Sequence, residues 1–543
     1  MATVCRIRVP TFLSFFVRHA MTVSTHNPPF RSTLSISLAA GALVTLCWFL
    51  LTWRYGFDFA DEGYYWYGAQ RVLRGEAPIR DFLAYDIGRY LWAAGVMALI
   101  GDDGMFGARA AAGLFQGLSV CLGVFLVLQA LDASLRTAGK ILLAVAVALI
   151  LNLWVIPYYK VYDFGAAILV VAMLVLMLGA QTPARWFGAG VILGLTAVIG
   201  RNHGLYGAAS GLLALAFLAF KTKRPTVLLL PALACIAGTV VGFSPNFLMA
   251  LAKPGFFDAF MASVIEHVHS TTGATNIPLP VPWPWTVAHG KDGWMLWASK
   301  VAIGAGFIAL LLVPALAILA LLRKRLADFT RLDYLTLAAA FTALMYAHYA
   351  YSRADLVHLA VSLLPVILLL LAATVRMPGK FAVLAGMLGV SVLMLLQDVP
   401  LLDNKVLGRK MKTVEIGGSM LHVQPFIADY IADSDAAFAS VPGARANFLA
   451  LPNFPGLHAH YKAKMGIYEI YALSARSAAF EESELARLDG MPPQVVLLSN
   501  HGLDRKSDLR YSSMHPLTYR WILDHYRRVE VRRSQNLEIY VKK

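Results

Sequence analysis

Carboxylates and arginines are concentrated in one stretch of the sequence, residues 57–92. Its charged residues are Asp58, Asp61, Glu62, Arg71, Arg74, Glu76, Arg80, Asp81, Asp86 and Arg89. A carboxylate beside a hydroxyl group can accept its proton, and an arginine can donate two parallel hydrogen bonds to a phosphate. Charged loops are more often solvated surfaces whose ion pairs contribute little to stability, and for most of this stretch we prefer that interpretation. Asp61 and Glu62 are the exception, and Asp58, Asp81 and Asp86 are secondary candidates.

Polar groups also interrupt apolar runs at three later positions. They are Lys160 with Asp163, Arg201 with Asn202 and His203, and Arg353 with Asp355 and His358. Ionisable groups near membrane depth are energetically unfavourable, so a functional role is the default hypothesis. For Lys160, an ordinary interfacial anchor explains the sequence equally well. Asp355 is expected to cap a helix and to pair with His358, three residues later, whereas Arg353 does not share that helix face.

The composition excludes a protein made only of water-soluble domains. Of the 543 residues, 58% are hydrophobic and 15% are charged, against roughly 45–50% and 25% in soluble domains. With only four cysteines, a secreted disulfide scaffold is excluded as well. Long apolar runs predict membrane-spanning helices. We expect about eleven spans, at residues 32–53, 105–130, 141–157, 165–180, 187–200, 204–220, 226–243, 297–321, 333–350, 355–374 and 380–397.

The basic residues predict how these spans are oriented. There are 47 Lys and Arg against 32 Asp and Glu, a formal net charge of +15, and alternate short loops are basic, as cytoplasmic loops are. We therefore expect a cytoplasmic segment 1–31, a mainly α-helical membrane domain 32–397 with outer loops 54–105 and 243–300, and an extracytoplasmic domain 398–543. In the last segment, PQVVLLSN and NLEIYVKK are typical of strands and FIADYIADS of a helix. This C-terminal part is predicted to be a small α/β domain.

Two helices are expected within the first outer loop. The residues from Glu62 to Arg74 have helical, amphipathic spacing, which predicts a helix lying along the membrane surface. Tyr64, Tyr65, Trp66 and Tyr67 suit a membrane–water interface. The apolar stretch 90–101 is too short to span, so we expect it to be a re-entrant or surface-lying helix.

The sequence DEGYYWYGAQRVLRGEAPIRDF, residues 61–82, resembles the first extracytoplasmic loop of the GT-C superfamily of integral-membrane glycosyltransferases. The nearest branches are the protein O-mannosyltransferases and the aminoarabinose transferases that modify lipid A. In those relatives an Asp-Glu pair after the first membrane helix opens a helix that continues to a Gly and a Pro-x-x-Asp. Here these residues are Asp61–Glu62, Gly75 and Pro78–Asp81. The resemblance implies a GT-C-like bundle with an outer C-terminal domain.

The resemblance also implies an activity. The family moves a sugar from a polyprenyl-phosphate donor to an extracytoplasmic lipid, glycan or protein acceptor. Asp61 would be the catalytic base, with inversion at the sugar C1, and Glu62 would orient Asp61 or hold a metal. The expected ligands of the donor phosphate are Arg89, Arg201, Arg353 and Lys160, with Asp163, His203 and His358 as further candidates. Arg89 would replace the Lys that contacts this phosphate in some relatives. The chain departs from those relatives in lacking the prolines that they carry before this position, where it reads YDIGRY.

No cofactor is expected to be obligatory. Some superfamily members use Mg²⁺ or Mn²⁺, so a divalent cation bridging Asp61 or Glu62 to the phosphate stays open. A zinc site at Glu266, His267 and His269 is not expected, because histidines two residues apart do not share a helix face. The expected partners are the lipid-linked donor, the acceptor and membrane lipids, with no nucleic acid. The expected location is the plasma (inner) membrane.

Other functions remain open. An O-antigen ligase or polymerase also has many spans and outer arginines, although it generally lacks an acidic helix after the first span and a folded C-terminal domain. A lipid-linked-sugar flippase or secondary transporter would concentrate its polar residues at mid-membrane, whereas here they gather at one face. The sequence contains no P-loop motif, GxxxxGK(S/T), and so it gives no sign of ATP-driven transport. A non-catalytic membrane scaffold would require the acidic loop to be inert.

Overall fold

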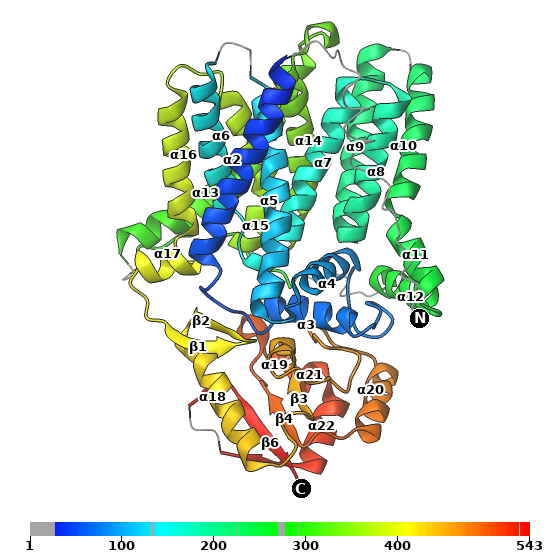
Figure 1. Ribbon diagram of the computed structural model, residues 1–543, viewed down its shortest axis with the longest axis vertical. Helices are drawn as coiled ribbons and strands as arrows, with labels where there is room; N and C mark the ends of the chain where they lie inside the picture. Colours follow the sequence, from blue (N-terminus) through cyan, green and yellow to red (C-terminus); the bar gives the residue numbers. More distant parts are fainter. Residues whose placement is uncertain (1–27, 132–134, 224, 270–276, 291–292, 531–532) are drawn as a thin grey trace, which may run out of the picture.

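Three layers make up the protein: a helical bundle, a layer of short helices at one end of it, and a C-terminal α/β domain beyond those helices (Figure 1). The computed structural model describes residues 28–131, 135–223, 225–269, 277–290, 293–530 and 533–543. Residues 1–27 of the predicted cytoplasmic segment 1–31 lie outside the described residues. Residues 28–31 already belong to the first helix of the bundle.

Each predicted span corresponds to a helix of the bundle. These helices are α2 (Pro28–Thr52), α5 (Met105–Gln129), α6 (Thr137–Leu153), α7 (Val161–Gly179), α8 (Pro183–Ile199), α9 (Arg201–Thr222), α10 (Leu229–Gly242), α13 (Trp294–Leu322), α14 (Arg331–Ser352), α15 (Leu356–Thr374) and α16 (Lys380–Leu395). Within the described residues, seven helical segments are long and apolar enough to cross a membrane. Leucines such as Leu43, Leu212 and Leu312 are more than half exposed on the bundle, as expected of side chains that face lipid. The predicted helical membrane bundle is confirmed.

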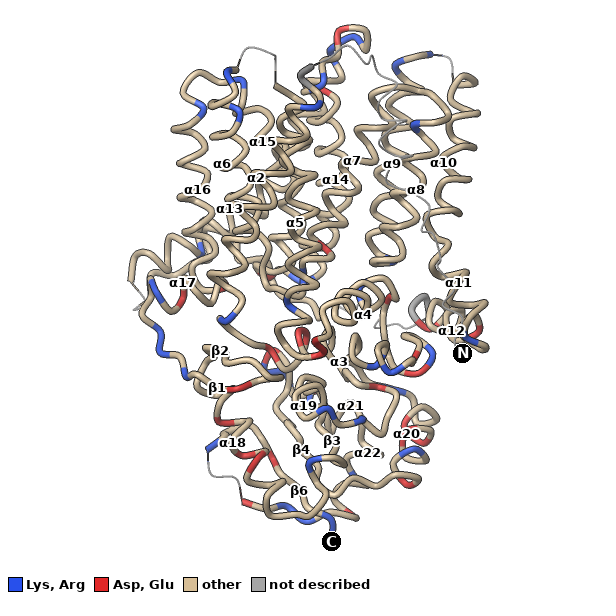
Figure 2. The backbone as a smooth tube through the Cα atoms, in the orientation of Figure 1, with Lys and Arg blue, Asp and Glu red and all other residues tan. Residues whose placement is uncertain are grey.

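Charge is distributed unequally between the two ends of the bundle. Figure 2 shows that the charged residues at the end away from the C-terminal domain are mostly Lys and Arg, whereas most Asp and Glu lie in the other two layers together with further Lys and Arg. The short connections from α5 to α6, α7 to α8, α9 to α10, α13 to α14 and α15 to α16 lie at this basic end (Figure 1). The described parts of the predicted outer loops lie together with the C-terminal domain at the opposite end. The side of the membrane that each end faces stays a prediction.

The middle layer contains the expected helices of the first outer loop. It consists of α3 (Asp61–Leu73), α4 (Gly88–Ile100), α11 (Ser244–Ala252), α12 (Phe256–His269) and α17 (Pro400–Lys405). The predicted helix is present as α3, and every residue from Glu62 to Arg71 is buried against protein. The C-terminal domain covers the face that an amphipathic helix would otherwise offer to lipid headgroups. By contrast, α4 lies at the base of the bundle and exposes 85% of Leu99.

Close backbone contact attaches α3 to the C-terminal domain. A Cβ atom added to Gly63 would lie 2.4 Å from the backbone nitrogen of Gly456, so α3 meets α19 with no side chain between them. The Tyr67 hydroxyl donates to the carbonyl of Ala463 over 3.2 Å. The turn at Gly417, where φ is +55°, packs directly on the indole of Trp66. The aromatic residues of α3 are therefore core residues, not interfacial anchors.

The C-terminal domain is a small α/β fold. Its strands are β1 (Lys412–Ile416), β2 (Ser419–Val423), β3 (Phe448–Leu451), β4 (Val495–Leu498), β5 (Tyr526–Val529) and β6 (Glu538–Lys542). Its helices are α18 (Pro425–Ser440), α19 (Pro455–His460), α20 (Ala478–Gly490), α21 (Tyr511–Met514) and α22 (Pro516–His525). The four-stranded sheet has the order β3-β4-β6-β5 and only β3 and β4 are parallel. The sequence predicted β4, β6 and α18 correctly.

Candidate active site

Two carboxylates stand at the start of α3. Asp58 accepts hydrogen bonds from the backbone N–H groups of Ala60 and Asp61, both over 3.0 Å, in the turn that leads into the helix. The Tyr471 hydroxyl, from the C-terminal domain, donates to Asp61 Oδ1 over 2.6 Å. The pKa of Asp58 is raised to about 7, mainly by burial and to a smaller extent by the negative charge of Asp61. Asp61 is thus held between the middle layer and the C-terminal domain.

Glu62 forms a buried ion pair with Arg109 of α5. Arg109 Nε lies 2.7 Å from Glu62 Oε1 and Nη2 lies 2.9 Å from Oε2, a bidentate arrangement. Both residues are at most 5% exposed. Arg109 also donates to the carbonyls of Trp53 and Gly56. The pair therefore fixes the start of α3 to the bundle.

The residues present do not fit a divalent cation at Asp61 and Glu62. Both carboxylate oxygens of Glu62 already accept hydrogen bonds from Arg109. One oxygen of Asp61 accepts from Tyr471, and both oxygens of Asp58 accept from backbone N–H groups. Within the described ranges, no group of three or more His, Cys, Asp or Glu residues could hold a metal. The side chains of His267 and His269 lie outside the described part of the structure.

A second cluster is built around Asp163 at the start of α7. Asp163 is 3% exposed. Arg89 Nη2 and His203 Nε2 lie 3.2 and 2.8 Å from Asp163 Oδ1, and Lys160 Nζ lies 3.5 Å from Oδ2. Lys160 also donates to the Tyr349 hydroxyl over 2.9 Å. Four of the residues singled out in the sequence are thus brought together from four helical segments.

The Asp163 cluster adjoins Asp61. Lys160 lies within electrostatic reach of the Asp61 carboxylate, and its neighbour Tyr159 lies beside Asp61. In the described structure the Arg89 Nε atom is buried and has no hydrogen-bond partner. A buried donor of this kind is energetically unfavourable unless something else accepts from it. Two permanent cations face one carboxylate here, and one donor remains for an anion.

Asp86 and Arg201 form a pair at the edge of this cluster. Asp86 Oδ1 accepts from the Arg201 backbone nitrogen over 2.9 Å, and Arg201 Nε lies 3.3 Å away. Arg201 also donates to Ser263 Oγ over 3.0 Å. Burial raises the pKa of Asp86 even though Arg89 and Arg201 lie nearby. Asp86 therefore positions the first residue of α9.

Asp81 lies apart from these groups. It pairs with its neighbour Arg80 over 2.8 Å and accepts from the Ala77 backbone nitrogen over 2.7 Å. These bonds close a local turn after α3. Asp81 therefore fits the interpretation that we prefer for most charges in this loop, namely local or solvated ion pairs.

The elbow between α14 and α15 forms another separate network. Asp355 caps α15 and accepts from both the backbone nitrogen and Nδ1 of His358, over 2.9 and 2.7 Å, as predicted. The expectation that Arg353 is not beside Asp355 is wrong. The helix begins only at Leu356, so helical spacing does not apply, and Arg353 Nε lies 2.8 Å from Asp355 Oδ2. Arg353 also holds Asp504 of the C-terminal domain, with distances of 2.8 and 3.0 Å.

Sequence reasoning missed several residues of the site. Arg109 is the one with a usable signal, because an arginine inside a predicted span indicates a buried partner. Tyr349 belongs to an aromatic run at the end of a span, and this run is only a weak signal. For Tyr471 there is none, since it meets Asp61 across 410 residues of sequence.

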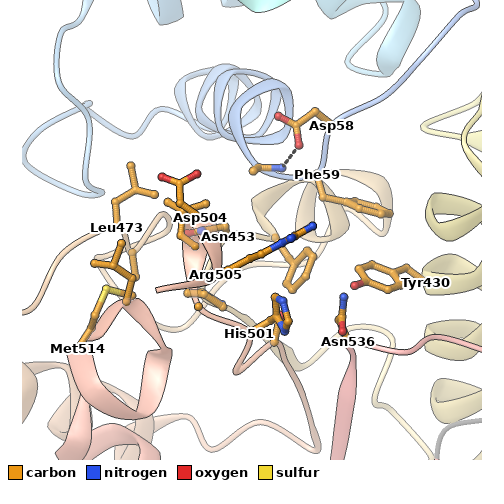
Figure 3. A pocket seen from close by; sticks show the side chains of 18 of the residues that line it. Asp58, Phe59, Tyr430, Asn453, Leu473, His501, Asp504, Arg505, Met514 and Asn536 are labelled. Carbon is orange, nitrogen blue, oxygen red and sulfur yellow. Dashed lines mark hydrogen bonds between the residues drawn. The ribbon is translucent and has the colours of Figure 1, made fainter. Parts of the chain in front are cut away.

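A cavity of about 410 Å³ opens beside Asp58, between residues 58–60 and the C-terminal domain (Figure 3). Asp58 borders it on the side of α3. The loops that follow β3 and β4 border it on the other side. The helix start that carries Asp61 therefore has an accessible space next to it.

Comparison with known proteins identifies the fold. No protein-family model and no curated protein matches the sequence. The crystal structure of ArnT from Cupriavidus metallidurans bound to undecaprenyl phosphate matches 94% of this chain and 97% of its own, with a TM-score of 0.51 and 13% identity. The apo state of that protein gives 0.50 at 13% identity, over 94% of this chain and 96% of its own.

A further similarity is to the apo crystal structure of an Archaeoglobus fulgidus oligosaccharyltransferase. It covers 87% of this chain and 70% of its own, at 12% identity and a TM-score of 0.44, so the fold assignment rests on the ArnT structures. ArnT is an aminoarabinose transferase with a GT-C architecture. The bundle, the acidic helix after its first span and the outer α/β domain therefore make this chain a protein of the GT-C fold.

Proposed function

We propose that this protein is a membrane glycosyltransferase that moves a sugar from a polyprenyl-phosphate donor to an extracytoplasmic acceptor. The observation that carries the proposal is the position of Asp61, at the start of α3, between a cluster of cations and a cavity. The ArnT structure with the same fold is bound to undecaprenyl phosphate, which supports a polyprenyl-phosphate donor. The protein would lie in a plasma (inner) membrane, with the basic end of the bundle on the cytoplasmic side.

Asp61 would act as the general base. Its Oδ1 accepts from Tyr471, which orients the carboxylate, and the other oxygen would take the proton of the acceptor hydroxyl as that hydroxyl attacks the sugar C1. Attack assisted by a single base on the face opposite the leaving group inverts the configuration at C1. Glu62 would act indirectly, by fixing α3 to α5 through Arg109.

The leaving phosphate would be stabilised by the cations around Asp163. As the C1–O bond breaks, charge accumulates on the lipid phosphate, and preorganised donors stabilise it. Arg89 has a buried Nε without a partner in the described structure, and Lys160 and Arg201 lie beside it. Arg353 and His358 remain predictions for this role, although Arg353 already pairs with two carboxylates.

The test compares wild type with Asp61→Asn. Both proteins are purified in detergent and incubated with membranes and a panel of radiolabelled polyprenyl-phosphate sugars. Asparagine keeps an acceptor for Tyr471, so the fold should be retained, while transfer should fall at least about 100-fold, the usual contribution of a general base. Asp103→Asn is the matched control, because Asp103 lies after α4 and makes an exposed pair with Lys462.

Two outcomes would contradict the proposal. Equal transfer by wild type and Asp61→Asn would show that Asp61 is not the base. If wild type transfers none of the sugars but moves a lipid-linked sugar across vesicles, the protein is a flippase or transporter.

A further inference from the structure

The cavity beside Asp58 has the construction of a ligand site. Its volume of about 410 Å³ lies within the roughly 300–1,000 Å³ typical of small-molecule sites. It lies beyond Leu451 and Leu498, the carboxyl ends of the parallel strands β3 and β4. Ligands commonly bind at this edge of α/β sheets because the loops there diverge.

One wall of the cavity is aromatic. The rings of Phe59 and Tyr430 are nearly parallel, with centroids 6.1 Å apart, and Phe454 packs edge-on against both. Phe59, Phe454 and Tyr430 are only 3%, 8% and 9% exposed, so the rings pack mainly on one another and give the cavity an apolar side. The wall includes Phe59, two residues before Asp61 in the sequence.

The opposite wall is cationic and polar. It is formed by Ser499, His501, Arg505 and Asn536. His501 and Arg505 are exposed, and within the described residues no hydrogen bond or ion pair of the Arg505 guanidinium group is present. Figure 3 shows the Arg505 side chain extending toward Phe59 and Tyr430, with Asn536 beside Tyr430. A guanidinium group without a protein partner is free to bind an anion.

The backbone that carries Arg505 is held in an unusual conformation. Asp504 and Arg505 both have positive φ, +53° and +61°, a region that residues other than glycine rarely adopt. The two consecutive side chains point in different directions (Figure 3). Asp504 is held by Arg353 of the bundle over 2.8 and 3.0 Å. The ion pair with the bundle therefore maintains the turn that directs Arg505 into the cavity.

We propose that this cavity binds the acceptor, and that the acceptor is an anionic saccharide, a sugar bearing a phosphate or carboxylate group. The anion pairs with Arg505, the sugar ring lies against the apolar side of the cavity that includes Tyr430, and a hydroxyl group is directed toward the start of α3. This inference rests on the proposed function, because the acceptor is the second substrate of that reaction. Its binding step can be measured separately from transfer.

The test measures binding to the full-length protein in detergent by calorimetric titration, with glucose 6-phosphate, glucose and inorganic phosphate as probes. Wild type should bind glucose 6-phosphate at least fivefold more tightly than either of the other two. Arg505→Gln should weaken glucose 6-phosphate binding about 10-fold, since a charge-assisted pair is lost. Arg510→Gln removes the same charge from the same loop but outside the cavity lining, and it should bind as wild type does.

Three results would overturn the inference: no binding of glucose 6-phosphate, equal affinity for inorganic phosphate, or equal weakening in the two arginine variants. Thermal unfolding of each variant checks that it is folded. Asp61→Asn should bind glucose 6-phosphate as tightly as wild type does. Failure of transfer therefore tests the proposed function, and failure of binding tests the anionic acceptor site.

Discussion

Glu62→Gln distinguishes between two roles of Glu62: fixing α3 to α5 through Arg109, and taking part in the transfer reaction. The substitution keeps the size of the side chain but removes its charge, and the new amide group must direct N–H toward one nitrogen of Arg109. Glu62 now accepts two charge-assisted hydrogen bonds, over 2.7 and 2.9 Å, and Arg109 is 2% exposed. Glutamine can accept only one of them.

The structure gives a magnitude for this loss. Removing one partner of a buried ion pair typically destabilises a protein by about 3–5 kcal/mol, because the other charge remains buried without compensation. Arg109 keeps its hydrogen bonds to the carbonyls of Trp53 and Gly56. We therefore expect the lower end of that range, about 3 kcal/mol, and a Tm several degrees below that of wild type.

The assay is thermal unfolding in detergent, followed by transfer measured well below the Tm. Asp61→Asn is the comparison, because the partly exposed Asp61 keeps its bond to Tyr471 and should change the Tm little while abolishing transfer. Glu62→Gln should show the reverse, a lower Tm with residual transfer. The double variant Glu62→Gln, Arg109→Gln removes the uncompensated charge and should be less destabilised than the sum of the single variants.

A clear result would refute this reasoning. If Glu62→Gln unfolds at the wild-type temperature and transfers no sugar, Glu62 takes part in the reaction and the buried pair is not its main role. If the double variant is destabilised by the full sum, the two side chains are not energetically coupled.

Two further predictions concern pH and packing. The pKa of Asp58 is raised from 3.8 to about 7, so between these values the folded protein binds more protons than the unfolded chain and its stability falls as the pH rises. Asp58→Asn removes this term, and its Tm should decline less than that of wild type between about pH 4 and pH 7; equal declines in thermal unfolding would contradict it. Gly63→Ala places a Cβ 2.4 Å from the backbone of Gly456 and should destabilise the protein by about 1–3 kcal/mol. The control Gly95→Ala, which meets no atom within 4 Å, should leave the Tm unchanged or slightly raised, and the same Tm for both variants would show that the contact between α3 and α19 is loose.

Local patterns in the sequence predicted most of the architecture. Apolar runs marked the bundle helices, basic loops marked one end of the bundle, and the short segments PQVVLLSN and NLEIYVKK marked β4 and β6. These features depend on consecutive residues, since hydropathy and strand propensity act over one element at a time. The cap at Asp355 is of the same kind, because it joins residues three positions apart.

Such local patterns do not predict whether lipid or protein covers the apolar face of a helix. The spacing of α3 is amphipathic, and an amphipathic helix packs equally well against lipid headgroups or against a protein domain. Only the tertiary structure places the C-terminal domain over it, through the contact of Gly63 with Gly456. The same limit applies to Arg353, whose partner Asp504 lies 151 residues away.

The sequence by itself determined a helical membrane bundle, the end of the bundle at which its polar residues gather, and the position of Asp61 at a helix start, while the resemblance of residues 61–82 implied the GT-C type. The tertiary structure decided which charges meet: Glu62 with Arg109, Asp163 with Arg89, and Asp61 with Tyr471. The reason is physical. Hydrophobic periodicity is a property of neighbouring residues, whereas an ion pair depends on which distant segments pack together, and several pairings of the same charges satisfy the sequence equally well.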